Sequence, residues 1–210
     1  MKGRMHCTWG KCGAWLISLV FHPIFIPFYT LLLYFEISRY FFYDTVRILR
    51  LLFMSAVVVP LLLLILLNRF KVLQSALPHD CRTRAFFSIL LAVIYALLAR
   101  TLQPLTGLRQ LAVYFAGISI SLLMAAVLYG FRKKISLHAL AVGGTLFFFL
   151  RWSYAYSVNI LHIIVLVIAL GTLVLISRLI LNAHTPVQLA WGFFVGMAGQ
   201  LAALWLIRWF

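Results

Sequence analysis

Acidic residues are scarce in this sequence, because Asp and Glu together number 3 among 210 residues while Lys and Arg number 18. The three carboxylates are Glu36, Asp44 and Asp80. A paired-carboxylate glycosidase site and an oxygen-rich two-metal site each need several carboxylates close together. The composition therefore argues against both kinds of site, and any chemistry must depend on histidines and cations.

Charge of either sign is also low, since 10% of the residues are charged and 65% are hydrophobic. A soluble domain would carry about 25% charged residues. Apolar runs of about 20 residues, each long enough to cross a bilayer as a helix, recur along the chain. We predict an all-α, polytopic membrane bundle of six to seven transmembrane helices that forms one domain over residues 1–210. The seven runs lie at about 15–35, 49–67, 85–102, 111–129, 136–152, 159–181 and 186–209.

The small number of cysteines excludes a disulfide framework or a structural zinc site of the usual spacing. Cys7, Cys12 and Cys81 form no CxxC pair, and the first two, beside a histidine, make a metal pattern without a second half. We expect free thiols and no bound metal.

The formal net charge of +15 comes from cations scattered among the predicted membrane loops. Basic residues beside a membrane attract anionic headgroups, each by about 1 kcal/mol near the surface. We therefore expect the bilayer and a phosphorylated lipid as partners, and no nucleic acid. The sequence does not indicate an oligomeric state.

Two prolines interrupt the first apolar run. Pro23 and Pro27 each lack a backbone donor, so the helix should bend or break near His22. The run is too long for a signal-peptide core and no small-residue cleavage site follows it, so we expect a retained helix. The simplest interpretation of His22 is a hydrogen-bonded histidine at a kink.

The most informative pattern lies near the C-terminus. Ser177 and Arg178 are followed after five residues by His184, and Gln188 stands four positions after that histidine. Thr185 is expected to cap the helix that follows, which places His184 just ahead of a helix N-terminus. A hydroxyl, a cation and an imidazole in this order suit an anionic, oxygen-rich ligand.

A shorter pattern upstream supplies a second set of such groups, namely Lys134, Ser136 and His138. Ser136 should cap the helix that it precedes. Two predicted crossings separate this segment from a basic loop that holds Arg82 and Arg84, and two separate it from the C-terminal pattern. All three segments should therefore meet one face of the membrane.

Two imidazoles at two helix starts could divide the work of phosphoryl transfer. A neutral imidazole can attack phosphorus, while a protonated one can give a proton to the leaving oxygen.

His162 is instead expected to be a satisfied interior histidine in the middle of the sixth run, and Gly143-Gly144 to permit close helix packing.

The C-terminal pattern is similar to SRxxxxxHxxxD, the third signature of the type 2 phosphatidic acid phosphatase superfamily, and Ser136-Leu137-His138 resembles its second signature, PSGH. The resemblance covers about residues 134–196, and Phe21-His22-Pro23 with the Arg82 to Arg84 loop also resembles the divergent membrane branch of this superfamily in Bacteroidetes. It implies a metal-independent integral-membrane lipid phosphatase without cofactors. The substrates of the family include phosphatidic acid, phosphatidylglycerol phosphate, polyprenyl diphosphate and lipid A.

The resemblance also implies roles for single residues. His184 would be the nucleophile that forms a phosphohistidine, and His138 the acid and base for the leaving and attacking oxygens. Phosphate oxygens would be held by a hydroxyl and four cations, which are Ser136, Arg178, Lys134, Arg82 and Arg84. Ordinary interfacial cations would equally explain Arg178 and Lys134.

The nucleophile-orienting position departs from the family pattern. Gln188 stands where the family has an aspartate, and its amide can accept a hydrogen bond but cannot stabilise a developing imidazolium by charge. Asp80 could take that role, or could form a salt bridge to Arg82 or Arg84. The departure leaves two alternatives open, a weak or inactive relative that binds or moves anionic lipids, and a purely structural membrane protein.

Two further departures concern the cations and the second signature. The first signature of the family, KxxxxxxRP, is absent before the second, so either Arg82 and Arg84 or Arg132 and Lys133 would have to supply its cations. The proline and glycine of PSGH are replaced by Ile135 and Leu137.

The distribution of charge does not fix the orientation in the membrane. The predicted motif face carries eleven Lys and Arg and the other face carries seven, which favours a cytoplasmic site. Six of the eleven are candidates for phosphate binding, and without them the balance is five against seven. Family members usually act on the outer side of the bacterial cytoplasmic membrane, so the resemblance favours an extracytoplasmic site in that membrane.

Overall fold

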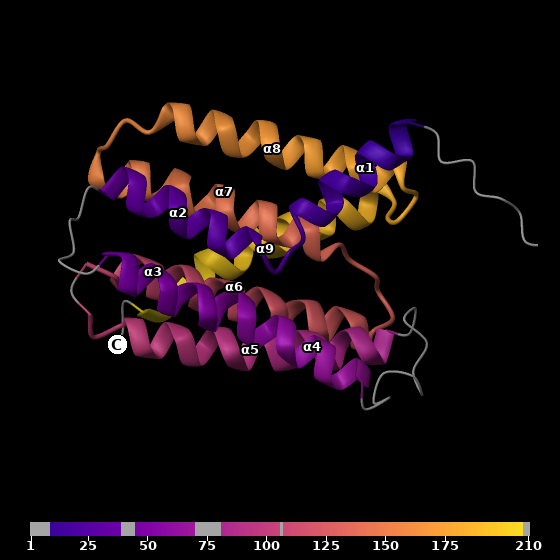
Figure 1. Ribbon diagram of the computed structural model, residues 1–210, viewed down its shortest axis with the longest axis horizontal. Coiled ribbons are helices and arrows are strands. Elements are labelled where there is room, and N and C mark those ends of the chain that lie inside the picture. The colour runs from indigo at the N-terminus through magenta and orange to yellow at the C-terminus, as the bar shows by residue number, and fades with distance from the viewer. Residues whose placement is uncertain (1–8, 39–44, 70–80, 106, 208–210) are drawn as a thin grey trace, which may run out of the picture.

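The computed structural model describes residues 9–38, 45–69, 81–105 and 107–207, which are almost entirely helical and include no strand (Figure 1). The predicted all-α class is confirmed. In chain order the helices are α1 (Trp9–Val20), α2 (Ile26–Ser38), α3 (Thr45–Phe53), the π-helical turn η1 (Met54–Val58), α4 (Val59–Arg69), α5 (Cys81–Leu102), α6 (Arg109–Gly130), α7 (Leu137–Tyr156), α8 (Leu161–Ile180) and α9 (Pro186–Ile207).

Among the described residues, five helical stretches are long and apolar enough to cross a membrane. One of them runs without interruption through α3, η1 and α4. Outward-facing side chains on α8, among them Leu161, Val165 and Ile176, are large, apolar and exposed, as expected where a helix faces lipid. The five stretches are Val46–Leu66, Cys81–Leu102, Arg109–Gly130, Leu161–Ile180 and Pro186–Leu206.

The first apolar run is broken, as its prolines predicted. α1 ends at Val20 and α2 begins at Ile26. In the break, Nδ1 of His22 accepts a hydrogen bond from the backbone N–H of Ile24 at 3.4 Å. The interpretation of His22 as a hydrogen-bonded histidine at a kink is confirmed, although the same ring also reaches the candidate site described below.

Another proline explains the π-helical turn η1. Pro60 has no backbone N–H, so it cannot donate to the carbonyl of Ala56. The hydroxyl of Tyr95 on α5 donates to that carbonyl instead, at 3.1 Å. A helix-breaking residue is therefore accommodated because a neighbouring helix satisfies the freed backbone group.

Glycines bring α7 and α9 together backbone to backbone. A Cβ atom on Gly143 would meet the backbone of Phe193, and one on Gly196 would meet the backbone of Leu140. Only glycine permits such a close approach, so the predicted packing role of Gly143 is confirmed. The contact fixes the start of α9 relative to the start of α7, and these starts carry the two sequence patterns.

A buried hydroxyl cluster joins three helices in the interior. The Oγ1 of Thr30 lies 3.0 Å from the hydroxyl of Tyr114 and 3.1 Å from Oγ1 of Thr145. The amide of Gln200 on α9 donates to the carbonyl of Tyr114 at 3.0 Å. In a lipid environment such hydrogen bonds hold helices together without a hydrophobic driving force.

Two sequence-based expectations are wrong. His162 is the second residue of α8 and is exposed, because the helix begins only at Leu161 and its first turn lies at the end of the bundle. Cys12 is disulfide-bonded rather than a free thiol. Cys81 is free and partly buried.

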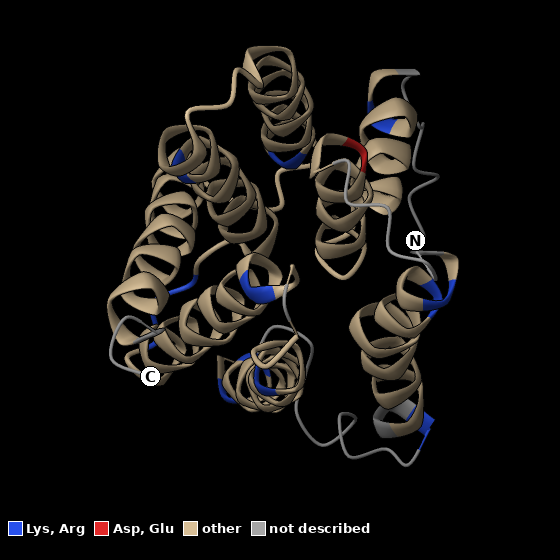
Figure 2. Ribbon diagram, turned by 90° about the vertical axis from the view of Figure 1, so that its left-hand side faces the viewer, with Lys and Arg blue, Asp and Glu red and all other residues tan. Residues whose placement is uncertain are grey.

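Charge is distributed unevenly between the two ends of the bundle. The starts of α1, α5 and α7 and the turn between α8 and α9 lie at the right-hand end in Figure 1. Glu36, the only acidic residue in the described ranges, lies near the end of α2 and so at the opposite end, which Figure 2 shows from outside. The described part of the right-hand end therefore carries cations and histidines without any carboxylate side chain.

Candidate active site

The turn between α8 and α9 sets the distance between Arg178 and His184. α8 ends at Ile180, and Asn182 adopts a left-handed conformation with φ of 50°, which asparagine tolerates better than most residues. The backbone N–H of Ala183 donates to the carbonyl of Arg178 at 3.1 Å. The five-residue spacing in the sequence is thus a helix end closed by one tight turn.

A capping box begins α9 just after His184. The hydroxyl of Thr185 accepts a hydrogen bond from the backbone N–H of Gln188 at 3.3 Å. The side-chain Oε1 of Gln188 accepts one in return from the backbone N–H of Thr185 at 3.4 Å. The predicted cap is confirmed, and the reciprocal bond fixes the Gln188 side chain at the helix start.

The same Oε1 atom of Gln188 lies 3.0 Å from Nδ1 of His184. A backbone N–H can only donate, so the contact with Thr185 identifies this Gln188 atom as the oxygen and not the amide nitrogen. His184 must therefore carry a proton on Nδ1 to make this hydrogen bond. In the neutral ring the lone pair is then on Nε2, the nitrogen available for attack.

The environment of His184 favours its neutral form. Burial lowers the pKa of His184 below its ordinary value, the hydrogen bond that its Nδ1 donates to Gln188 raises it, and the nearby charges of Arg178, Arg84 and Lys134 lower it further. The net shift is downward. An imidazole whose pKa is lowered in this way is mostly neutral at neutral pH, and the neutral ring is suited to act as a nucleophile rather than as a proton donor.

Ser136 begins α7 and is fully buried. Its Oγ accepts a hydrogen bond from the backbone N–H of Ala139 at 3.4 Å, so the predicted helix cap is confirmed. Its own backbone N–H donates to the carbonyl of Gln188 at 3.3 Å. These contacts tie the two patterns together and are structural, whereas the phosphate contact of Ser136 stays a prediction.

His138 follows in the first turn of α7 and is 7% exposed. Its Nε2 lies 3.2 Å from the backbone carbonyl of Ser18 and 3.4 Å from the Ser18 hydroxyl. A terminal nitrogen of Arg178 donates to that same hydroxyl at 2.6 Å. Ser18 on α1 therefore lies between the candidate acid–base residue and the candidate phosphate-binding arginine.

The remaining predicted cations differ in their placement. Arg84 is partly buried on α5 and lies close enough to influence both His184 and Arg178 electrostatically, and Lys134 is exposed but also influences His184. Arg82 is exposed at the second residue of α5. The structure thus groups Arg84 and Lys134 with the histidines more closely than Arg82.

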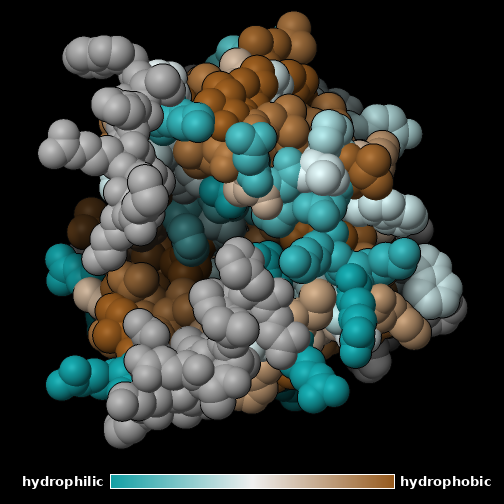
Figure 3. Space-filling model, turned by 90° about the vertical axis from the view of Figure 1, so that its right-hand side faces the viewer, coloured by the Kyte–Doolittle hydropathy of each residue, from teal (hydrophilic) through white to brown (hydrophobic). Residues whose placement is uncertain are grey.

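Two guanidinium nitrogens are buried without a hydrogen-bond partner among the described residues. They are Nε of Arg178 and Nε of Arg84. Buried donors of this kind are normally satisfied, so each one left over needs a partner. Figure 3 shows this end of the molecule, where hydrophilic side chains gather around a recess. Arg84 lies close enough to Arg178 for the two guanidinium groups to repel each other, so a bound anion would relieve that repulsion.

Asp80, the alternative orienting carboxylate, lies outside the described residues. Within the described ranges no group of three or more histidine, cysteine or acidic residues lies close enough to hold a metal ion. The described donors, imidazoles and cations, match an anion better than a metal.

The sequence patterns gave no role in the site to two residues that lie within it. Ser18 is a single serine in an apolar helix, and nothing in its spacing marks it. The ring of His22 packs edge to face against His138, with centroids 5.8 Å apart. The sequence marks His22 by the kink at Pro23 and by the resemblance of Phe21-His22-Pro23 to a family pattern, but its proximity to His138 follows only from the fold.

Comparisons with protein-family models, with curated proteins and with solved structures find no match to this chain.

Proposed function

We propose that this chain is an integral-membrane lipid phosphatase that hydrolyses a phosphate or diphosphate headgroup through a phosphohistidine at His184. One observation carries the proposal. His184 is held by Gln188 with its Nδ1 protonated and its Nε2 available for attack, beside two arginines whose buried Nε atoms have no partner in the described structure. A nucleophile next to an anion site is what phosphoryl transfer requires.

The first chemical step transfers the phosphoryl group to the protein. Arg178, Arg84 and Lys134 neutralise the phosphate oxygens, and Nε2 of His184 attacks phosphorus. The negative charge of the bound phosphate favours the protonated form of His138. The bond between phosphorus and the lipid oxygen breaks, and His138 gives its proton to that oxygen. The lipid alcohol, or the lipid monophosphate from a diphosphate, then leaves.

The second step restores the histidine. His138, now neutral, accepts a proton from water as the water oxygen attacks the phosphohistidine. The bond between phosphorus and Nε2 breaks, and inorganic phosphate leaves. The proton that His138 lost in the first step is regained in the second, so the cycle needs no metal and no cofactor.

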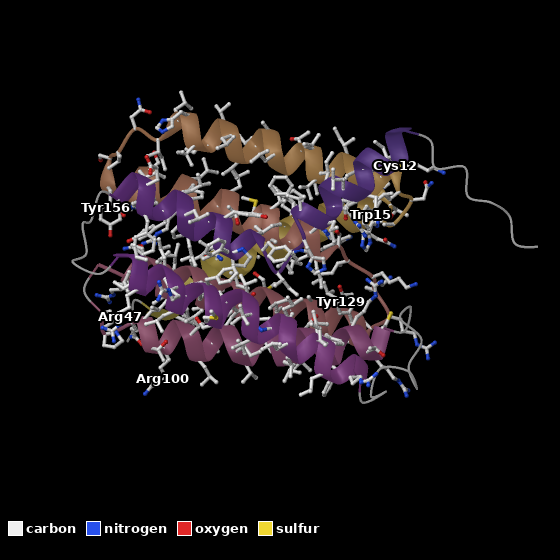
Figure 4. The ribbon with its side chains drawn as sticks, viewed as in Figure 1. Cys12, Trp15, Arg47, Arg100, Tyr129 and Tyr156 are labelled. Carbon is white, nitrogen blue, oxygen red and sulfur yellow. The ribbon has the colours of Figure 1, made fainter. Side chains whose placement is uncertain are left out.

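The apolar helices support a seven-span arrangement. α1 and α2 would form one crossing interrupted at His22, α7 would form another among the buried helices, and the five long apolar stretches complete the set. We place the protein in the bacterial inner membrane with the site on the extracytoplasmic side. Cys12 supports this orientation because it is disulfide-bonded and lies at the site end of α1 (Figure 4), and disulfides persist in oxidising compartments.

A second candidate function is the binding or movement of anionic lipids without turnover. Gln188 favours this alternative, because a neutral amide gives the imidazolium of His184 no charge stabilisation. The fully buried hydroxyl of Ser136 also favours it, because one of the predicted phosphate ligands serves as a helix cap instead.

Phosphate release by purified protein in lipid nanodiscs separates the two functions. The substrates are phosphatidic acid, phosphatidylglycerol phosphate and a polyprenyl diphosphate, and the variants are His184→Ala and His138→Ala. We expect release from at least one substrate, lost by about 1000-fold or more in His184→Ala and by about 100-fold or more in His138→Ala. Release that survives loss of His184 contradicts the mechanism, and binding without release selects the second function.

A further inference from the structure

We propose that Ser18 is a positioning residue that aligns Arg178 and His138 for the phosphate chemistry. The inference rests on the proposed function, since it assigns a role within the same site. It adds a residue of α1, the first helix of the chain, to a site otherwise built from α5, α7, α8 and α9.

Ser18 is the only described hydrogen-bond partner of both side chains. Its Oγ accepts from Arg178 at 2.6 Å, and its backbone carbonyl lies 3.2 Å from Nε2 of His138. The residue is 7% exposed, and it lies 120 positions from His138 and 160 positions from Arg178 in the sequence. A packing contact between α1 and α8 would not require either polar interaction.

The hydroxyl of Ser18 orients the guanidinium of Arg178. One terminal nitrogen is engaged by Ser18, while Nε is buried and lacks a partner in the described structure. A guanidinium held at one corner presents its other donors in a fixed plane, and bidentate recognition of phosphate depends on that plane. Ser18 therefore prepares Arg178 for the anion before it binds.

The carbonyl of Ser18 fixes the protonation pattern of His138. A carbonyl oxygen can only accept, so Nε2 of His138 carries a proton when this hydrogen bond forms. Nδ1 is then the nitrogen that exchanges a proton with the leaving group and with water. The ring of His22 packs edge to face against that of His138, with centroids 5.8 Å apart.

The side chain and the backbone of Ser18 can be separated by mutation. Ser18→Ala removes the hydroxyl, which is the partner of Arg178, and leaves the carbonyl, which is the nearer of the two contacts to His138. It should therefore impair Arg178 more than His138. Ser18→Thr keeps a hydroxyl. Ser119→Ala is the matched control, because Ser119 is also buried and joins two helices by donating to the carbonyl of Ala92 at 2.8 Å.

The test measures orthovanadate affinity by thermal shift on the full chain in detergent, so it does not depend on turnover. Ser18→Ala should weaken vanadate binding about 10-fold or more, as expected when a charged group loses a hydrogen bond. Ser18→Thr should restore most of the affinity and Ser119→Ala should leave it unchanged. In an Arg178→Gln background, Ser18→Ala should cause no further loss, because Ser18 acts through Arg178.

Each outcome bears on one proposal or the other. Any one of four results overturns the role of Ser18. Two concern Ser18→Ala alone, namely an unchanged vanadate affinity or a loss no larger than that of Ser119→Ala. The other two are a loss in Ser18→Ala that adds to that of Arg178→Gln, and a wild type that does not bind vanadate. Vanadate binding that depends on Ser18 in a protein that releases no phosphate from any lipid upholds that role and rejects the proposed phosphatase.

Discussion

Gln188 combines two tasks in one side chain, since its Oε1 accepts from the backbone N–H of Thr185 and from Nδ1 of His184. The first hydrogen bond completes the capping box and the second selects the histidine tautomer. A glutamate would make the same two contacts and add a negative charge. Compared with an acidic residue at this position, Gln188 thus makes the same contacts but gives His184 no electrostatic support.

Gln188→Glu should therefore increase the rate of phosphate release by about 10-fold, because a carboxylate stabilises the positive charge that develops on the His184 ring as Nε2 attacks phosphorus. Steady-state kcat on the best lipid substrate is the measurement. Gln188→Ala, which loses both hydrogen bonds, is the control and should be slower than the wild type. A Gln188→Glu variant as slow as Gln188→Ala would contradict this account of the orienting position.

The pH dependence of activity follows from the lowered pKa of His184, which burial causes in the first place. Its neutral form is the nucleophile, so kcat/KM should fall as pH decreases through this pKa, with a midpoint below the ordinary value of about 6.5. In Gln188→Glu the added charge should move the midpoint to higher pH. A wild-type midpoint above 6.5 would show that His184 is not held neutral.

The lowered pKa of His184 also determines the direction in which the stability of the fold changes with pH. The folded protein resists protonation of His184, whereas the unfolded chain binds that proton near pH 6.5. The contribution of His184 to the free energy of unfolding is therefore unchanged above this pH and becomes unfavourable as pH falls below it. Acidification should lower the melting temperature of the wild type more than that of His184→Ala.

At this scale the sequence predicted the residues that form local patterns and missed those that depend on the fold. The caps at Ser136 and Thr185 follow from residue type and position, and both are present. Ser18 has no local signal, because both of its partners lie more than a hundred positions away. His162 was wrongly expected in the interior because its neighbours are apolar, although it lies only three residues after the predicted start of its run at 159.

Among the elements, the pair α7 and α9 is the most sensitive to substitution. A Cβ on Gly196 would meet the carbonyl of Leu140, and one on Gly192 would meet the carbonyl of Ser136. The second contact lies directly below the candidate site. Any separation of these helices would also break the bond between the Ser136 N–H and the Gln188 carbonyl.

Gly196→Ala should therefore destabilise the protein by about 1–3 kcal/mol, the usual cost of overpacking, and should reduce phosphate release. The matched control is Gly130→Ala at the end of α6, where a Cβ would meet no atom within 4 Å. Thermal unfolding in detergent and the lipid assay are the measurements. Equal melting temperatures for the two variants would contradict the close packing of α7 on α9.

The positions of the helices were largely predictable, because apolar runs and prolines mark them directly. The break around His22 follows from Pro23 and Pro27. The π-helical turn η1 was not predicted, because the consequence of Pro60 depends on the hydroxyl of Tyr95 from another helix. A glycine pair such as Gly143-Gly144 can mark a helix contact in the sequence, but a single sequence does not identify the helix on the other side.

At the scale of the whole molecule, the orientation in the membrane determines which end of the bundle faces the outside of the cell. Figure 4 shows Cys12 at one end, and Arg47, Arg100 and Tyr156 at the other. The charge balance alone gives no clear direction, since cations that serve a phosphate site would distort it. The disulfide at Cys12 favours an extracytoplasmic site.

Cysteine labelling in intact cells tests this orientation. Lys133 is exposed at the site end and Tyr154 is 89% exposed at the opposite end of α7. In a Cys81→Ser background, Lys133→Cys should react with a membrane-impermeant maleimide, and Tyr154→Cys should react only after the membrane is permeabilised. The reverse pattern would place the site in the cytoplasm, and labelling of both would show that α7 does not cross the membrane.

The central claim is a covalent phosphohistidine at His184, and trapping it is the most direct test. Wild-type protein is mixed with its radiolabelled lipid phosphate, quenched in base within milliseconds to seconds, and digested for mass spectrometry. The account predicts an acid-labile, base-stable phosphoryl group on the peptide that contains His184, and none in His184→Ala. Phosphate release without any label on His184, or label on another residue, would contradict it.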